Sequence, residues 1–336
     1  MSAFAAATGV GSWPGTSPRP AAEVVVGELH HLPHLVELPH RGVGADMIGR
    51  AAALLIDLAL DTVPRGYRVV ARAGAVTRRA VSLLDEDLDA LEEAWERAGL
   101  RGGDRTVKVQ APGPVTLAAH LELSRGHRAI TDDGAVRDLA ASLAEGVAAH
   151  RAEVSRRLDS PVVVQFDEPS LSAALAGRLT GVTTLTPVHP LDETVAVGLL
   201  DDCVAAAGGQ VCVHSCAADV PWTVLRRSTV QAVSIDASAP GRLDLDGLGE
   251  FVDAERTVLL GVVPVTAPPV APSPAAMAET AAALADRLGF ARTLLTKRVG
   301  VTPACGLAGA TPDWARTAIG LTQQVADAFI EDPEAI

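Results

Sequence analysis

Three side chains that can bind a metal follow two Val-rich segments of the sequence. His214 and Cys216 stand two residues apart in QVCVHSCAAD, and Cys305 follows VGVTPA. On a β-strand, a spacing of two puts both side chains on one face. Imidazole and thiolate are preferred zinc ligands, held at about 2.0–2.3 Å in tetrahedral geometry. The pattern predicts a zinc site, although an isolated His-x-Cys pair is often accidental and free cysteines often only pack in a core.

A tetrahedral zinc site needs a fourth ligand. Asp236 ends the next Val-rich segment, QAVSID, and is the best carboxylate candidate. Cys212 shares the parity of His214 but lies deeper in its segment, and Cys203 lies in a helical stretch. We therefore assign both of these cysteines to the core.

Further polar residues follow other apolar segments. Asp167 and Glu168 are adjacent in VVVQFDEPSL, so on a regular strand they point to opposite sides. One can then face a site while the other braces a loop; the alternative is a pair of charges at a helix start before Pro169. Gly11 and Ser12 follow ATGVG, in a motif that lacks the third glycine of a dinucleotide-binding loop.

Strand and helix patterns alternate along the chain. Short β-rich runs occur at 7–11, 67–72, 106–110, 161–166, 210–213, 231–235, 257–263 and 298–302. Amphipathic stretches occur at 46–60, 81–99, 134–158, 191–207, 273–289 and 312–330, the last with Thr311 as N-cap and Pro312 at its first position. Most of the β-rich runs are apolar on both sides, as is typical of buried parallel strands.

This alternation predicts one (β/α)8 barrel domain over residues 1–336, with a doubly wound open sheet as the alternative. The His-, Pro- and Gly-rich stretch 12–45 is expected to be a long loop over the barrel mouth, and 264–274 a rigid loop after the seventh strand. In a barrel the carboxyl ends of all strands lie on one face. The predicted metal ligands and Asp167 are therefore expected to converge there.

Composition and charge narrow the class of protein. The 336 residues are 48% hydrophobic and 21% charged, which is typical of a globular chain. A net charge of −13 argues against nucleic acid or an anionic membrane as a partner. Four scattered cysteines, no apolar run long enough to cross a membrane and no signal peptide favour a cytoplasmic location with reduced thiols.

Six motifs occur in an order that is typical of one family: GVGSWPGT, APGPVT, VVVQFDEPSL, VCVHSCAAD, VSIDAS and VTPACGL. Over nearly its whole length the chain resembles the C-terminal catalytic barrel of cobalamin-independent methionine synthase. That barrel is one of the zinc-dependent thiol alkyltransferases, which are related in fold to uroporphyrinogen decarboxylase. The resemblance implies zinc on His214, Cys216 and Cys305, with Asp236 where the family has Glu.

The resemblance also implies a binding site for a small thiol, with homocysteine as the acceptor that gives methionine. Asp167, the expected catalytic residue, would take the ammonium group of the substrate, and Ser12 its carboxylate. Gly11 and Glu168 are expected to be further substrate contacts.

Three departures from the family pattern bear on the partners. No Glu shortly precedes the Asp46-Met47 pair, Thr266 stands where the family has a proton-donating His, and His120 stands where it has a folate-contacting Trp. The half of the long enzymes that helps to bind folate is also not in this sequence. We therefore expect a non-folate methyl donor, a corrinoid or a corrinoid protein. The alternatives are alkyl transfer from an epoxide to another thiol, and a metal- or corrinoid-binding barrel without turnover.

Overall fold

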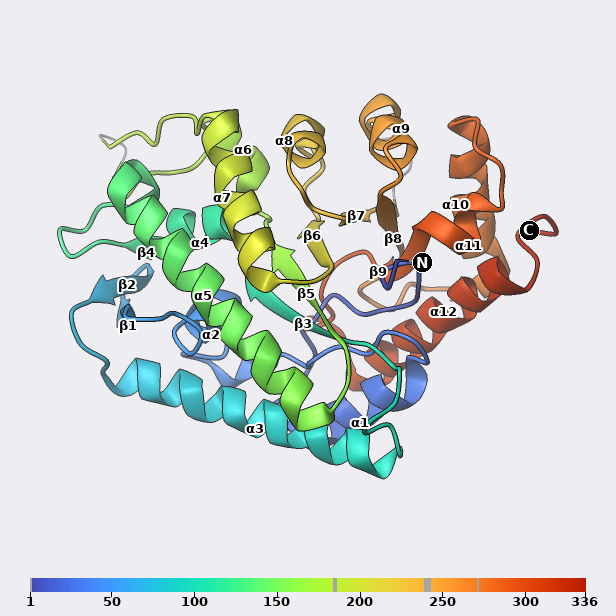
Figure 1. Cartoon of the computed structure of the whole chain (residues 1–336), viewed down its shortest axis with the longest axis horizontal. Coiled ribbons are helices and arrows are strands. Elements are labelled where there is room, and N and C mark those ends of the chain that lie inside the picture. The colour runs from blue at the N-terminus through green and yellow to red at the C-terminus, as the bar shows by residue number, and fades with distance from the viewer. Residues whose placement is uncertain (1, 184–185, 239–242, 271) are drawn as a thin grey trace.

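A parallel sheet forms the centre of the computed structural model, which describes residues 2–183, 186–238, 243–270 and 272–336 (Figure 1). The sheet has the order β3-β5-β6-β7-β8-β9. Its strands are β3 (Val107–Pro112), β5 (Val162–Asp167), β6 (Val211–Ser215), β7 (Ala232–Asp236), β8 (Thr257–Val263) and β9 (Val299–Pro303). Neighbours in the sheet follow chain order, so the α/β alternation predicted from the sequence is confirmed for these six strands.

Helices follow the strands and lie along the outside of the curled sheet (Figure 1). The longer ones are α1 (Pro18–Glu28), α3 (Ala75–Arg97), α5 (Asp133–Leu158), α7 (Glu193–Ala207), α9 (Leu245–Asp253), α10 (Pro274–Arg287) and α12 (Pro312–Glu331). The short ones are α2 (Met47–Ala51), α4 (Pro114–His120), α6 (Leu171–Leu175), α8 (Trp222–Arg227) and α11 (Leu294–Arg298), with 3-10 turns at Pro39–Arg41 and Ala129–Thr131.

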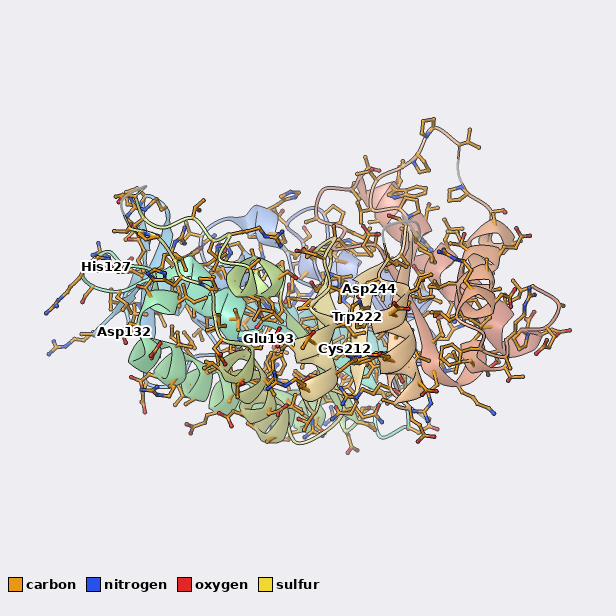
Figure 2. The ribbon with its side chains drawn as sticks, turned by 90° about the horizontal axis from the view of Figure 1, so that it is seen from above. His127, Asp132, Glu193, Cys212, Trp222 and Asp244 are labelled. Carbon is orange, nitrogen blue, oxygen red and sulfur yellow. The ribbon has the colours of Figure 1, made fainter. Side chains whose placement is uncertain are left out.

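Side-chain caps fix where several helices begin. Asp132 accepts a hydrogen bond from the Ala135 amide at the start of α5, and Asp244 accepts one from the Gly247 amide at the start of α9. Figure 2 labels both aspartates. Thr311 accepts from the Trp314 amide, so the predicted N-cap of α12 is confirmed. Such caps satisfy amide groups that have no partner within the helix.

A complete eight-stranded barrel is not confirmed. The first predicted strand, 7–11, forms a single isolated bridge, between Ala7 and Val301, as far as the described residues go. Two further parallel bridges join Ser12 to Glu37 and His34 to Lys108. Extended backbone thus connects the two edge strands β9 and β3, but Gly11, at φ +150°, interrupts a regular strand there.

The predicted strand at 67–72 was wrong as a member of this sheet. Residues Gly66–Val70 form β2, which pairs antiparallel with β1 (Ala59–Val63) and parallel with β4 (Leu121–Glu122) in a separate small sheet. Val63 pairs with Gly66, so two residues make the turn, and the positive φ of Gly66 suits a tight connection. The helix predicted at 46–60 covers only Met47–Ala51, because turns follow it and β1 begins at Ala59.

The stretch 12–45 is not a simple loop, because it contains helix α1. Ala21, Ala22, Val25 and Val26 are buried on one face of this helix, which packs against α3 and α12. Their spacing is that of an amphipathic helix, and a proline stands in its first turn, where proline is tolerated. This local signal was hidden by the surrounding His, Pro and Gly residues.

The inner side of the sheet holds a small apolar cluster. Its members are Phe4, Ala6, Leu32, Val163, Cys212, Ala232 and Leu259. A much larger cluster fills the space between the sheet and the helices. Cys212 and Cys203 are fully buried, so their assignment to the core is confirmed. Within the described ranges, no helix is both long and apolar enough to cross a bilayer.

Candidate metal and substrate site

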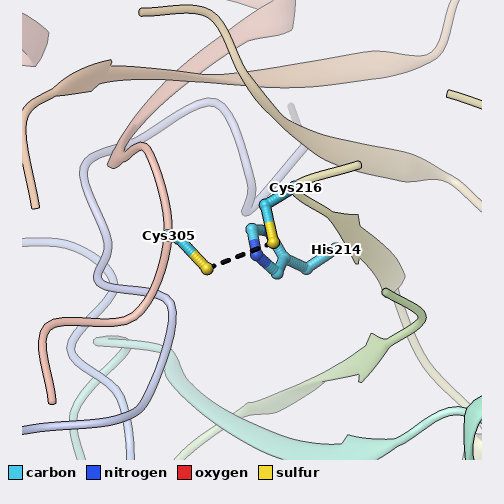
Figure 3. Close-up of side chains that lie close together, drawn as sticks. All are labelled: His214, Cys216 and Cys305. Carbon is cyan, nitrogen blue, oxygen red and sulfur yellow. Dashed lines mark hydrogen bonds between the residues drawn. The ribbon is translucent and has the colours of Figure 1, made fainter. Parts of the chain in front are cut away.

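The three residues predicted to converge do so at the carboxyl edge of the sheet. His214 lies on β6, Cys216 follows that strand directly, and Cys305 follows β9 (Figure 3). One ligand atom from each lies within 4.8 Å of the other two. The two sulfur atoms are 3.2 Å apart and share a hydrogen bond. Tetrahedral zinc ligands are separated by about 3.3–3.8 Å, so this group needs little adjustment to surround one ion.

The orientation of His214 also fits a metal ligand. Its Nδ1 lies 3.0 Å from Ser234 Oγ on the neighbouring strand β7, whereas its Nε2 is buried and has no hydrogen-bond partner in the described part of the chain. A buried polar atom left without a partner costs about 1–3 kcal/mol. An imidazole that donates from Nδ1 presents a free lone pair at Nε2, which is the usual arrangement of a metal-bound histidine. The residues present therefore fit a zinc ion.

The two cysteines influence each other's protonation. The hydrogen bond that Cys305 shares with Cys216 lowers the pKa of Cys305, and the nearby His214 acts in the same direction. The same hydrogen bond, together with burial, raises the pKa of Cys216. Zinc binds cysteine as the thiolate, so a bound cation would take the place of the protons on both sulfurs.

Asp236 is set apart from this group. It is the half-buried last residue of β7, and its Oδ1 accepts a hydrogen bond of 2.9 Å from the Ser238 amide. Its carboxylate is not among the ligand atoms that gather within 4.8 Å, as far as the described residues go. The role of Asp236 as fourth ligand stays a prediction.

A cavity of about 290 Å³ opens on the metal-binding group. Its lining includes His214, Cys216, Cys305, Ser12, Asp167, Glu37 and Met47. Two acidic side chains, three candidate zinc ligands and a hydroxyl thus face one small volume. Few polar groups converging in an otherwise apolar cavity are typical of a small-molecule site.

Asp167 lies where the sequence predicted, at the end of β5 beside His214. Its side chain is buried, and its Oδ1 accepts a 2.7 Å hydrogen bond from Gln165 Nε2. Burial raises the pKa of Asp167, while the charges of His214 and Lys108 and the hydrogen bond oppose that rise. The carboxylate therefore faces the cavity from a place where a cationic ligand would stabilise it.

Glu37 is a second acidic group in the cavity, and sequence reasoning missed it. It is buried, and Arg50 Nε lies 3.5 Å from its Oε1. Burial raises the pKa of Glu37 to about 7, against the charge of Arg50. No glutamate directly precedes Asp46-Met47 in the sequence, since Glu37 lies farther back, in HLVELP. A single acidic residue in an apolar run was the available signal.

Ser12 and Gly11 occupy different places. Ser12 is half-buried and lines the cavity. Gly11 is buried beside Gln110, and a Cβ on it would lie 2.6 Å from Gln110 Nε2. Its carbonyl accepts from the Glu37 amide at 3.1 Å. The backbone of Gly11 thus places both Ser12 and Glu37, and its predicted contact with substrate stays a prediction.

Glu168 serves another part of the fold. It is fully buried and accepts hydrogen bonds from the Val115 amide at 2.9 Å, the Thr116 amide at 2.8 Å and Thr116 Oγ1 at 2.6 Å. These donors form the start of α4, and Glu168 is not among the residues that line the cavity. Its placement does not support the predicted substrate contact, because alternation along the strand turns it away from Asp167. It braces a loop instead.

The comparisons with known proteins agree with this fold. The family model described as "Cobalamin-independent synthase, Catalytic domain" matches residues 4–328. The chain therefore belongs to this family of methionine synthase-like methyltransferases. A comparison of the sequence with curated proteins gives no significant match.

Two solved structures share the fold. A B12-independent methionine synthase from Shewanella sp. W3-18-1, in complex with selenomethionine, is 12% identical with a TM-score of 0.65, covering 99% of this chain and 100% of that one. A methyltransferase from Methanosarcina mazei is 14% identical with a TM-score of 0.55, covering 97% and 93%. The non-folate donor predicted from the sequence, a corrinoid or a corrinoid protein, is not supported, because the family is a cobalamin-independent one.

Proposed function

We propose that the protein is a zinc-dependent methyltransferase whose acceptor is a small thiol amino acid, with homocysteine converted to methionine. The observation that carries this proposal is one cavity that is lined both by His214, Cys216 and Cys305 and by two buried carboxylates. A thiol amino acid has a sulfur for the first set and an ammonium group for the second. The selenomethionine bound by the Shewanella synthase is an amino acid of the same length as the product.

Asp167 and Glu37 would bind the ammonium group of the acceptor. Both are buried, and burial raises the pKa of each, so an added cation between them lowers the cost of their charges. Hydrogen bonds between ionised groups are about twice as strong as neutral ones. Ser12, at the rim of the same cavity, would donate its hydroxyl to the carboxylate of the acceptor. Asp167 would thereby fix the position of the sulfur.

His214, Cys216 and Cys305 would hold the zinc, with Asp236 as the predicted fourth contact. When bound there, zinc lowers the pKa of a coordinating thiol, so that the acceptor sulfur is a nucleophile at neutral pH. In the transfer, the acceptor sulfur forms a bond to the methyl carbon, and the donor leaves with the electron pair of the broken bond. The thiol proton is released before that step.

The extended segments 6–13 and 33–37 would take the two remaining positions of a barrel. Hydrogen bonds between Thr8 and Val301, between Trp13 and Glu37, and between Leu35 and Lys108 support this arrangement. Such closure explains why Ser12 and Glu37 face the same cavity as residues from β5, β6 and β9.

Calorimetry and product analysis test the proposal together. Homocysteine is titrated into zinc-loaded protein, and methionine is sought by mass spectrometry with a panel of methyl donors that includes mono- and polyglutamyl methyltetrahydrofolate. We expect homocysteine to bind wild type and not Cys305→Ser, and methionine to form with one donor class. No binding of homocysteine, or a clear preference for a thiol without an amino group, would overturn the proposal.

A further inference from the structure

Lys108 is a buried cation that the proposed function does not use. It lies on β3 and is fully buried beneath the site. The sequence contains only two lysines, and the other, Lys297, is exposed. Burying a charge costs several kcal/mol unless the surroundings compensate it. A lysine kept inside this sheet, in a chain that otherwise uses arginine, therefore calls for a specific role.

The hydrogen bonds of Lys108 determine how Gln165 is oriented. Lys108 Nζ donates to the Val10 carbonyl oxygen at 3.1 Å and to Gln165 Oε1. An ammonium group can only donate, so it must meet the oxygen end of the amide. The nitrogen end of Gln165 then donates to the Val10 carbonyl at 2.8 Å and to Asp167 Oδ1 at 2.7 Å.

This chain of contacts ends at the carboxylate that faces the cavity. Removal of the ammonium group leaves Gln165 Oε1 buried without that donor, and the amide is then held by the contacts of its nitrogen with Val10 and Asp167. A turn of the amide would bring its oxygen against the oxygen of Asp167. Two acceptors in contact repel each other, so the carboxylate would leave its present position. Burial lowers the pKa of Lys108 to about 8, opposed by the charges of Asp167, Cys212 and Glu37, so the group is a cation at pH 7.

We propose that Lys108 is a positioning residue for the acceptor. Through Gln165 it holds Asp167 in the orientation that receives the ammonium group of a thiol amino acid. Lys108 itself touches no substrate, since its contacts are a backbone carbonyl and an amide oxygen. The inference rests on the proposed role of Asp167, and it adds the residue that gives the site its preference for an amino group.

Lys108→Met tests this, because it removes the charge and keeps an unbranched apolar side chain; Lys297→Met is the matched control. Zinc-loaded proteins are titrated with homocysteine and with 4-mercaptobutyrate, which has the same thiol and carboxylate but no amino group. We expect Lys108→Met to lose at least about tenfold of the wild-type preference for homocysteine, equal to about 1.4 kcal/mol. Its affinity for 4-mercaptobutyrate, its zinc content and its circular dichroism should not change, and Lys297→Met should equal wild type.

A crystal structure of Lys108→Met separates failure of this inference from failure of the proposed function. We expect a turned Gln165 amide and a displaced Asp167 carboxylate. An unmoved Asp167, or a retained preference for homocysteine, overturns the role of Lys108. A wild-type protein that binds both thiols equally overturns instead the ammonium-binding role of Asp167, and with it this inference. If Lys108→Met does not fold, Gln165→Leu breaks the same link without altering a charge and should show the same loss of preference.

Discussion

Asp167 and Glu168 are neighbours in sequence, both buried and both acidic, yet they serve opposite sides of one strand end. Asp167, on the inner side, accepts one side-chain hydrogen bond and faces the cavity beside His214. Glu168, on the outer side, accepts three hydrogen bonds at the start of α4. Burial and residue type do not distinguish the two carboxylates. What differs is the number of hydrogen bonds that each accepts from the protein: the carboxylate with fewer is available to a ligand, and the one with more stabilises the fold.

Zinc binding and activity on the inner side should depend most on the cysteine sulfurs. We expect Cys216→Ser to reduce zinc from about one per chain to less than about a tenth and to lower activity by more than about 10³-fold, because a tetrahedral site loses one of its thiolates. Metal analysis by mass spectrometry and a methyl-transfer assay measure both effects. Cys203→Ala, at a core cysteine on α7, is the control and should keep its zinc. If Cys216→Ser kept all of its zinc, the metal site would not lie on the inner side of the strand end.

Glu168, on the outer side, should make the free energy of unfolding depend on pH. Burial raises the pKa of Glu168 from 4.5 to about 7, so its contribution to stability is fully present below about pH 4.5 and is lost as the pH rises through about 7. The free energy of unfolding of wild type relative to Glu168→Gln should therefore fall by about 3 kcal/mol over that range. Urea unfolding at several pH values measures this difference. A difference that is flat between pH 4.5 and 7 would mean that Glu168 titrates normally.

Asp167→Asn should give the reverse pattern, a loss of binding with little loss of stability. Removal of one charge from the ammonium site should raise the KM for homocysteine about 30-fold, equal to about 2 kcal/mol, with kcat changed less. The thermal unfolding midpoint should stay within about 2 °C of wild type, since among the described residues Gln165 alone donates to this side chain. A large drop in unfolding temperature with an unchanged KM would place Asp167 with Glu168 as a structural residue.

Asp236 should give the smallest effect of the four. Its carboxylate stands outside the group of three ligands and already accepts from the Ser238 amide. Asp236→Asn should weaken zinc binding by about tenfold, as outer contacts of metal sites do, and leave the site filled at saturating zinc. Competition with a chelator measures this affinity. A loss as large as that of Cys216→Ser would make Asp236 a full ligand.

Local patterns in the sequence predicted much of the sheet and part of the site. The apolar runs that became β3, β5, β6, β7, β8 and β9 were recognisable because strands buried on both faces are Val-rich. The spacing of two in His214 and Cys216 put both side chains on one side of a strand, and the adjacency of Asp167 and Glu168 separated theirs. These rules need only the period of a strand, so they hold without knowledge of neighbouring segments.

The tertiary structure decided what depends on contacts between distant segments. Cys305 meets Cys216 because β9 and β6 end at the same edge of the sheet, and Glu37 enters the cavity because its backbone pairs with Ser12. β1 and β2 form a hairpin outside the main sheet, although their residues suit a strand of that sheet. Strand propensity does not specify which strand is the partner. Residue type and local spacing thus determined which groups can do chemistry, whereas long-range pairing determined which of them meet.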